Sequence, residues 1–81
     1  MRNRFYCVCV TISRSGDRDK PVNYYYKSPD RAEEHIDQYR QETLRGRNDY
    51  NIAKDEQNEL LLRNDNGTEC RLQLSECYFE D

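Results

Sequence analysis

The N-terminal part of the chain alternates between two kinds of side chain, which is the pattern of a β-strand. Between Arg4 and Arg14, the more apolar set consists of Tyr6, Val8, Val10 and Ile12. The intervening side chains are intermediate in polarity, namely Phe5, Cys7, Cys9, Thr11 and Ser13. We therefore expect a strand over residues 4–14, with the first set in the core and the second set partly covered.

A polar loop over residues 15–21 separates this strand from a second alternating segment over residues 22–27. In the second segment Val22, Tyr24 and Tyr26 share one face, while Asn23, Tyr25 and Lys27 share the other. A hairpin is the simplest connection between two such strands. The alternation also leaves at least one ring of the tyrosine triplet exposed.

Residues 29–45 carry the clearest helical signal. Ser28 is suited to the N-cap and Pro29 to the first helical position, and Gly46 is suited to a left-handed C-terminal cap. A narrow apolar stripe repeats at helical spacing through Ala32, Ile36, Tyr39 and Thr43, with His35 at its edge. We expect a helix that lies on a sheet with its outer side in water.

The secondary structure predicted after Gly46 is ambiguous over residues 49–62 and clearer for the last two strands. Residues 50–53 predict a short strand, although residues 49–62 also fit a polar helix; the asparagines favour the strand. Residues 58–64 and 69–79 predict two strands joined by Asp65-Asn66-Gly67. A three-residue loop pairs Leu62 with Cys70 and Leu60 with Leu72, whereas a two-residue loop sets both leucines against Arg71 and Gln73. Burial selects the first register.

These elements predict an α+β fold in one domain over residues 1–81. The order is β-β-α-β-β-β, giving an antiparallel sheet of four to five strands with one helix packed on a face. Strand order is left open.

Composition predicts a thin core. Leu, Ile, Val and Phe number 14 of 81 residues, but the net charge is only −3 and seven Tyr and four Cys add further bulk. We expect a folded domain of marginal stability, completed by a second subunit or another partner. No signal peptide or membrane span is apparent, so we expect a cytoplasmic protein with reduced cysteines.

Neither the charges nor the cysteines predict a dedicated chemical site. With 13 basic and 16 acidic residues, the chain is not the basic protein that nucleic-acid binding favours. A weak nucleic-acid module using Arg14, Arg18, Arg45 and Arg47 is kept as an alternative. Cys7 and Cys9 are too closely spaced for a zinc pair, and Cys70 and Cys77 fall on opposite faces of one strand. We expect no cofactor, no metal and no enzymatic activity, and we interpret His35 as a packing residue.

The residues that favour a macromolecular contact fall in three groups. Tyrosine is enriched at interface hot spots, which makes Tyr24, Tyr25 and Tyr26 the first group. An acidic helix patch of Glu33, Glu34 and Asp37 is the second. Leu61, with Phe79, points away from the predicted core face and is the third, as part of an exposed apolar patch.

In size and layout, tyrosine-rich strands around one helix capped by Ser28-Pro29-Asp30, the chain resembles small phage-encoded inhibitors of the anti-CRISPR type. The resemblance implies stoichiometric inhibition, by occlusion of a channel or assembly surface of a host defence complex in the host cytoplasm. It carries no diagnostic motif and assigns no functional residue. We therefore expect a small binding or inhibitor protein with a protein partner; the alternative outside this class is a homo-oligomeric structural protein.

Overall fold

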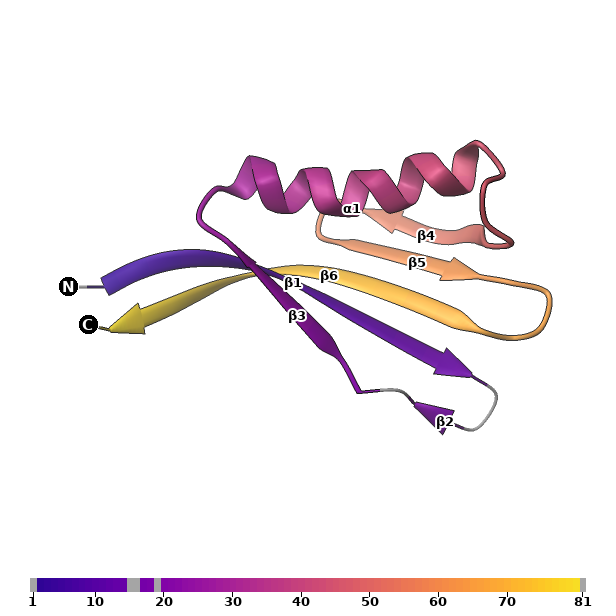
Figure 1. The fold of residues 1–81 in the computed structure, drawn as a ribbon, viewed down its shortest axis with the longest axis horizontal. Coiled ribbons are helices and arrows are strands. Elements are labelled where there is room, and N and C mark those ends of the chain that lie inside the picture. Colours follow the sequence, from indigo (N-terminus) through magenta and orange to yellow (C-terminus); the bar gives the residue numbers. More distant parts are fainter. Residues whose placement is uncertain (1, 15–16, 19, 81) are drawn as a thin grey trace.

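The computed structural model describes residues 2–14, 17–18 and 20–80, and folds them into an antiparallel sheet with one helix on a face (Figure 1). The elements are β1 (Arg2–Arg14), β2 (Asp17–Arg18), β3 (Val22–Tyr26), α1 (Pro29–Leu44), β4 (Asn51–Glu56), β5 (Glu59–Arg63) and β6 (Glu69–Glu80). The predicted α+β class and element order are confirmed. The one addition is β2, a two-residue strand within the segment expected to be a loop.

The strand order is β3-β1-β6-β5-β4, with β2 pairing β1 on the same edge as β3. The first and last strands of the chain are therefore neighbours in the middle of the sheet. Their pairing runs from Arg2 opposite Glu80 to Ser13 opposite Glu69. In Figure 1 the two chain ends accordingly lie together at one end of the sheet, and α1 connects the β3 edge to the β4 edge.

The core lies between α1 and one face of the sheet. It is formed by Val8, Val10, Ala32, Ile36, Leu60, Leu62, Cys70 and Leu72, with Tyr26 and Tyr39 among the partly buried residues around it. The alternation predicted for the first strand and the stripe predicted for the helix are both confirmed. The opposite face of the sheet carries no helix in the described part of the chain, so the fold has two layers and a short dimension of 17 Å.

Local sequence fixes both ends of α1. The Ser28 side chain accepts a hydrogen bond from the Asp30 amide at 3.2 Å. At the C-terminus Gly46 has φ +70°, and the amides of Gly46 and Arg47 donate to the carbonyls of Thr43 and Glu42. This is the Schellman pattern, which ends a helix at a left-handed glycine.

The β5–β6 hairpin has the register that burial selected. Leu62 lies opposite Cys70 and Leu60 opposite Leu72. The connecting turn places Gly67 at φ +82°, and the Gly67 amide donates to the Asn64 carbonyl at 3.2 Å. A glycine is favoured there because other residues adopt this conformation only with strain.

The segment after α1 is a strand, as preferred, but it is longer than predicted and irregular. β4 pairs antiparallel with β5, and its register shifts between Ile52 and Lys54. The shift is a β-bulge, which resets the alternation of side chains. As a result Asp55 lies opposite Leu60 on the helix side of the sheet, close enough to α1 to bind Arg40.

The expectation that Leu61 contributes to an exposed patch is wrong. Leu61 does point away from the helix face, but only 9% of it is exposed. Its register neighbours are Lys54 and Arg71, whose charged groups both bind Glu59, at 3.4 and 3.2 Å. The aliphatic parts of such side chains cover an apolar neighbour while their heads stay in water. The side chain of Phe79 lies outside the described residues.

Replacing Leu62 by alanine tests the core. Leu62 is fully buried, so Leu62→Ala should lower the free energy of unfolding by about 2–5 kcal/mol, measured by urea denaturation. Leu44→Ala is the matched control, because Leu44 is 65% exposed and its truncation should change stability by less than about 0.5 kcal/mol. Equal effects of the two variants would contradict this placement of the core.

Candidate protein-binding surface on β3

Exposed large apolar side chains of the described residues gather on one short strand. Of five large exposed apolar residues, three lie on β3: Val22 is 50% exposed, Tyr24 41% and Tyr25 53%. Among the described residues β3 pairs only with β1, so it forms an edge of the sheet. Aromatic rings on an edge strand are the kind of surface that protein interfaces use.

Two of the predicted tyrosines join a tyrosine–histidine cluster, which consists of Tyr24, Tyr26, His35 and Tyr39. The Tyr26 hydroxyl and His35 Nδ1 are hydrogen-bonded at 2.7 Å. Tyr24 meets the imidazole edge-to-face with ring centroids 4.7 Å apart, and Tyr39 stacks on it at 5.7 Å. Through this hydrogen bond and these ring contacts, the cluster links α1 to β3 and holds the exposed Tyr24 ring against the imidazole.

Burial keeps this cluster uncharged near neutral pH. It lowers the pKa of His35 below its usual range and raises the pKa of Tyr39. The imidazole is therefore neutral at pH 7, with Nδ1 already engaged by Tyr26. This arrangement agrees with the interpretation of His35 as a packing residue at the edge of the helical stripe.

An open hollow of about 640 Å³ adjoins the cluster. His35 and Tyr39 form its aromatic side, and Gln38, Glu42, Arg47 and Asn48 form the rest of its lining. The Arg47 and Glu42 side chains are paired at 3.5 Å, while the Asn48 amide donates to the Thr43 hydroxyl at 3.2 Å. The hollow thus offers an aromatic wall beside polar groups of both charges.

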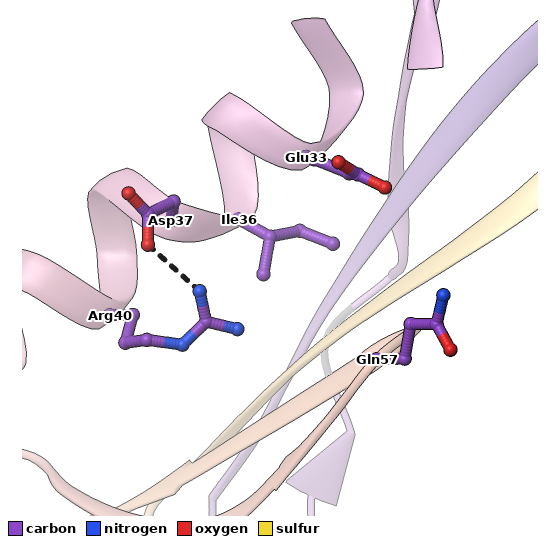
Figure 2. Close-up of a pocket in the computed structure, with 5 residues that line it drawn as sticks. All are labelled: Glu33, Ile36, Asp37, Arg40 and Gln57. Carbon is purple, nitrogen blue, oxygen red and sulfur yellow. Dashed lines mark hydrogen bonds and ion pairs between the residues drawn. The ribbon is translucent and has the colours of Figure 1, made fainter. Parts of the chain in front are cut away.

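Two residues of the predicted acidic helix patch, Glu33 and Asp37, lie on a different flank of α1. Figure 2 shows Glu33, Ile36, Asp37 and Arg40 on the other flank of α1, around a hollow of about 420 Å³ that also includes Gln57. Arg40 binds both carboxylate oxygens of Asp55 at 2.9 Å and also binds Asp37 at 2.8 Å. The pair with Asp55 ties α1 to β4, and Asp37 has its charge compensated.

The seven contact residues proposed from sequence therefore do not form one surface. Tyr24 and Tyr25 are exposed on β3, and Tyr26 is half-buried beneath α1. Glu34 is exposed on α1, and no ion pair of Glu33 or Glu34 occurs within the described part of the chain. Glu33 and Asp37 line the flank that faces the β4–β5 turn, and Leu61 is buried.

Sequence reasoning missed two contributors to the surface. Val22 was placed on the same face as Tyr24 and Tyr26 but not named as a contact residue, and Tyr39 was placed in the apolar stripe of the helix rather than in the wall of a hollow. The pairing of β1 with β6 leaves β3 at an edge, and this is what exposes Val22. Nothing in the local sequence of residues 22–27 indicates that Val22 is exposed.

The cysteines are divided between the two faces of the sheet. Cys70 lies in the core, while Cys7, Cys9 and Cys77 lie on the helix-free face, as the odd spacing of Cys70 and Cys77 predicted. All four thiols are free. Burial raises the pKa of Cys7 and Cys70, which keeps these thiols protonated and poor ligands. Over residues 2–14, 17–18 and 20–80, no group of three or more His, Cys, Asp or Glu is arranged to hold a metal ion.

Of the basic residues proposed for nucleic acid, Arg14, Arg45 and Arg47 are exposed, and the Arg18 side chain lies outside the described residues. Within the described chain, α1 is neither long nor apolar enough to cross a membrane. Comparison with known protein families, curated proteins and solved structures finds no match.

The hydrogen bond within the cluster can be tested by removing one hydroxyl. Tyr26→Phe keeps the ring and removes the partner of His35 Nδ1, so the free energy of unfolding at pH 7.5 should fall by about 0.5–1.5 kcal/mol. Tyr78→Phe is the control, because the Tyr78 hydroxyl donates to Glu76 at an exposed site. An unchanged stability of Tyr26→Phe would show that the bond contributes nothing.

The lowered pKa of His35 also predicts a pH dependence. Above about pH 6.5, the ordinary histidine value, the ring is neutral in both the folded and the unfolded chain. As the pH falls below that value, the unfolded chain takes up a proton that the folded chain resists, so stability decreases until the folded pKa is passed. Urea denaturation at pH 7.5 and 5.5 should therefore show a larger loss in the natural protein than in His35→Gln. The same loss in both proteins would contradict the assignment.

Proposed function

We propose that this protein acts by binding another protein that reaches around the β3 edge and contacts Tyr24 and the hollow beside His35 and Tyr39 on the helix side and Tyr25 on the helix-free face. The observation that carries the proposal is the concentration of exposed apolar area on β3 next to a preformed aromatic cluster. Rigid aromatic rings lose little conformational entropy on binding, and a cluster already held in place loses still less.

The mode of action that fits such a surface is stoichiometric: the protein covers part of its partner. The resemblance to small phage-encoded inhibitors implies the same mode, with a host defence complex as the target. We place the protein in the cytoplasm, where four free thiols remain reduced. The acidic residues Glu33 and Asp37 are not needed for this surface, since they face the other flank of α1.

Two half-exposed tyrosines provide a matched test. Tyr25 on β3 is 53% exposed and Tyr78 on β6 is 51% exposed, so truncating either removes a similar side chain from a similar environment. Affinity purification from cells of the source organism should recover the same partner with the natural protein and with Tyr78→Ala. Tyr25→Ala should bind that partner at least about tenfold more weakly by titration calorimetry, as expected at a hot spot. Equal affinities of the two variants would refute the surface.

The hollow is tested separately on the helix. Gln38 lines it and Gln41 does not, and both are exposed on α1. Gln38→Arg should weaken the same complex by filling the hollow with a charged side chain, while Gln41→Arg should leave the affinity within about twofold. Thermal unfolding of both variants checks that the fold is unchanged. If only Tyr25→Ala weakens binding, the contact is confined to β3.

A further inference from the structure

The two edges of the sheet are built differently. The β4 edge carries a bulge and the charged run Lys54-Asp55-Glu56. Bulges and charges on an edge are the usual protection against pairing with another chain. The β3 edge has neither: Val22–Tyr26 contains no charged residue and no proline, and it pairs with β1 without a register shift.

The sequence of β3 is complementary to itself. In an antiparallel pair of two copies with the two-fold axis at Tyr24, Val22 lies opposite Tyr26, Asn23 opposite Tyr25, and Tyr24 opposite its own copy. Directly opposed residues share a face of the sheet. This condition is met, because Val22, Tyr24 and Tyr26 all lie on the helix side, opposite Val10, Val8 and Tyr6 of β1.

This register also matches chemically. It pairs all five residues of β3, and no two like charges oppose each other, because the flanking Lys27 falls opposite Pro21 and Lys20 opposite Ser28. Aromatic pairs and aromatic pairs with β-branched residues stabilise neighbouring strands by about 0.2–1 kcal/mol each. The contact would cover the three exposed large apolar side chains of this edge, Val22 and Tyr24 on the helix side and Tyr25 on the helix-free face.

We propose that a second copy of this chain binds the β3 edge, joining two sheets into one continuous sheet of twofold symmetry. Both helices then lie on the same side, and the two Tyr24 rings meet at the axis. The tyrosine–histidine clusters of the two copies then lie on the same side of the joined sheet, one on each side of the axis. The inference stands on the geometry of the edge and does not depend on the proposed binding of another protein.

The contact is short, so the dimer is weak and reversible. A five-residue edge lies well below the size of a standard stable interface. Sedimentation velocity of the purified protein from about 10 µM to about 1 mM should therefore show a shift from the monomer mass of 9.8 kDa toward twice that mass. A monomer over the whole range would overturn the proposal.

Two double variants test the register with the same positions changed. Asn23→Lys with Tyr25→Lys sets positive charge against positive charge twice in the dimer, and should raise the dissociation constant at least about tenfold. Asn23→Glu with Tyr25→Lys sets opposite charges against each other and should dimerise at least tenfold more tightly than the first variant. Both variants lie on the helix-free face and lose the same contact of Asn23 with Cys7, so equal thermal stability is expected.

Hydrogen exchange locates the contact on the natural protein. Between dilute and concentrated solution, amides of residues 22–26 should gain protection and amides of residues 51–56 should not. Equal dimerisation of the two double variants, or protection gained at β4 instead of β3, would place the interface elsewhere and overturn the proposal. Neither readout involves the partner protein, so failure here leaves the proposed function unaffected.

Discussion

The antiparallel pairing of β1 with β6 is the interaction on which the rest of the structure depends. It joins the two ends of the chain over twelve residue pairs and forms the middle of the sheet. β1 has 13 residues and extends about 43 Å, whereas α1 has 16 residues and extends about 24 Å. One helix therefore covers only part of one face of the central strands. The core is confined to the covered part, and side chains elsewhere on the sheet have to be shielded by their neighbours.

That shielding is done largely by long polar side chains and aromatic rings. Lys54 and Arg71, held at Glu59, cover Leu61 on the helix-free face. Near the chain ends the Arg4 guanidinium lies over the Tyr78 ring at 5.6 Å. Arg40 closes the gap between α1 and β4 with two hydrogen bonds to Asp55. Of the acidic helix patch, Asp37 is paired with Arg40 within the fold, so its charge is not available as part of an interaction surface.

The sequence predicted the features that local chemistry and burial decide. Ser28 and Gly46 mark the helix, and burial of Leu60 and Leu62 fixes the hairpin register, because a slip by one residue exposes both. It did not predict what depends on distant pairing. The pairing of residues 2–13 with 69–80 leaves no local trace, yet it decides that β3 is an edge and that Val22 is exposed. The β-bulge near Ala53 is likewise not indicated by the local sequence, and without it Asp55 would face away from Arg40. The sequence therefore predicted the tyrosines of the candidate site but not the other residues that belong to it, Val22 and the hollow beside Tyr39.

The exposed edge and the aromatic cluster place a condition on how any partner binds. A partner strand that pairs with β3 occupies the same backbone groups as a second copy, so dimerisation competes with it and binding weakens as the protein becomes more concentrated. A partner that rests on the helix side contacts Tyr24 and the hollow, and two copies joined at β3 present both sets together. Binding then strengthens with concentration, because the dimer presents two such surfaces at once. Whether affinity for the partner falls or rises with the concentration of this protein therefore distinguishes the two modes, and no variant is needed. The partly buried Tyr26, His35 and Tyr39 hold the Tyr24 ring on the helix side, which favours the second mode for the Tyr24 contact. Tyr25 lies on the helix-free face, so a partner that contacts both tyrosines reaches around the β3 edge.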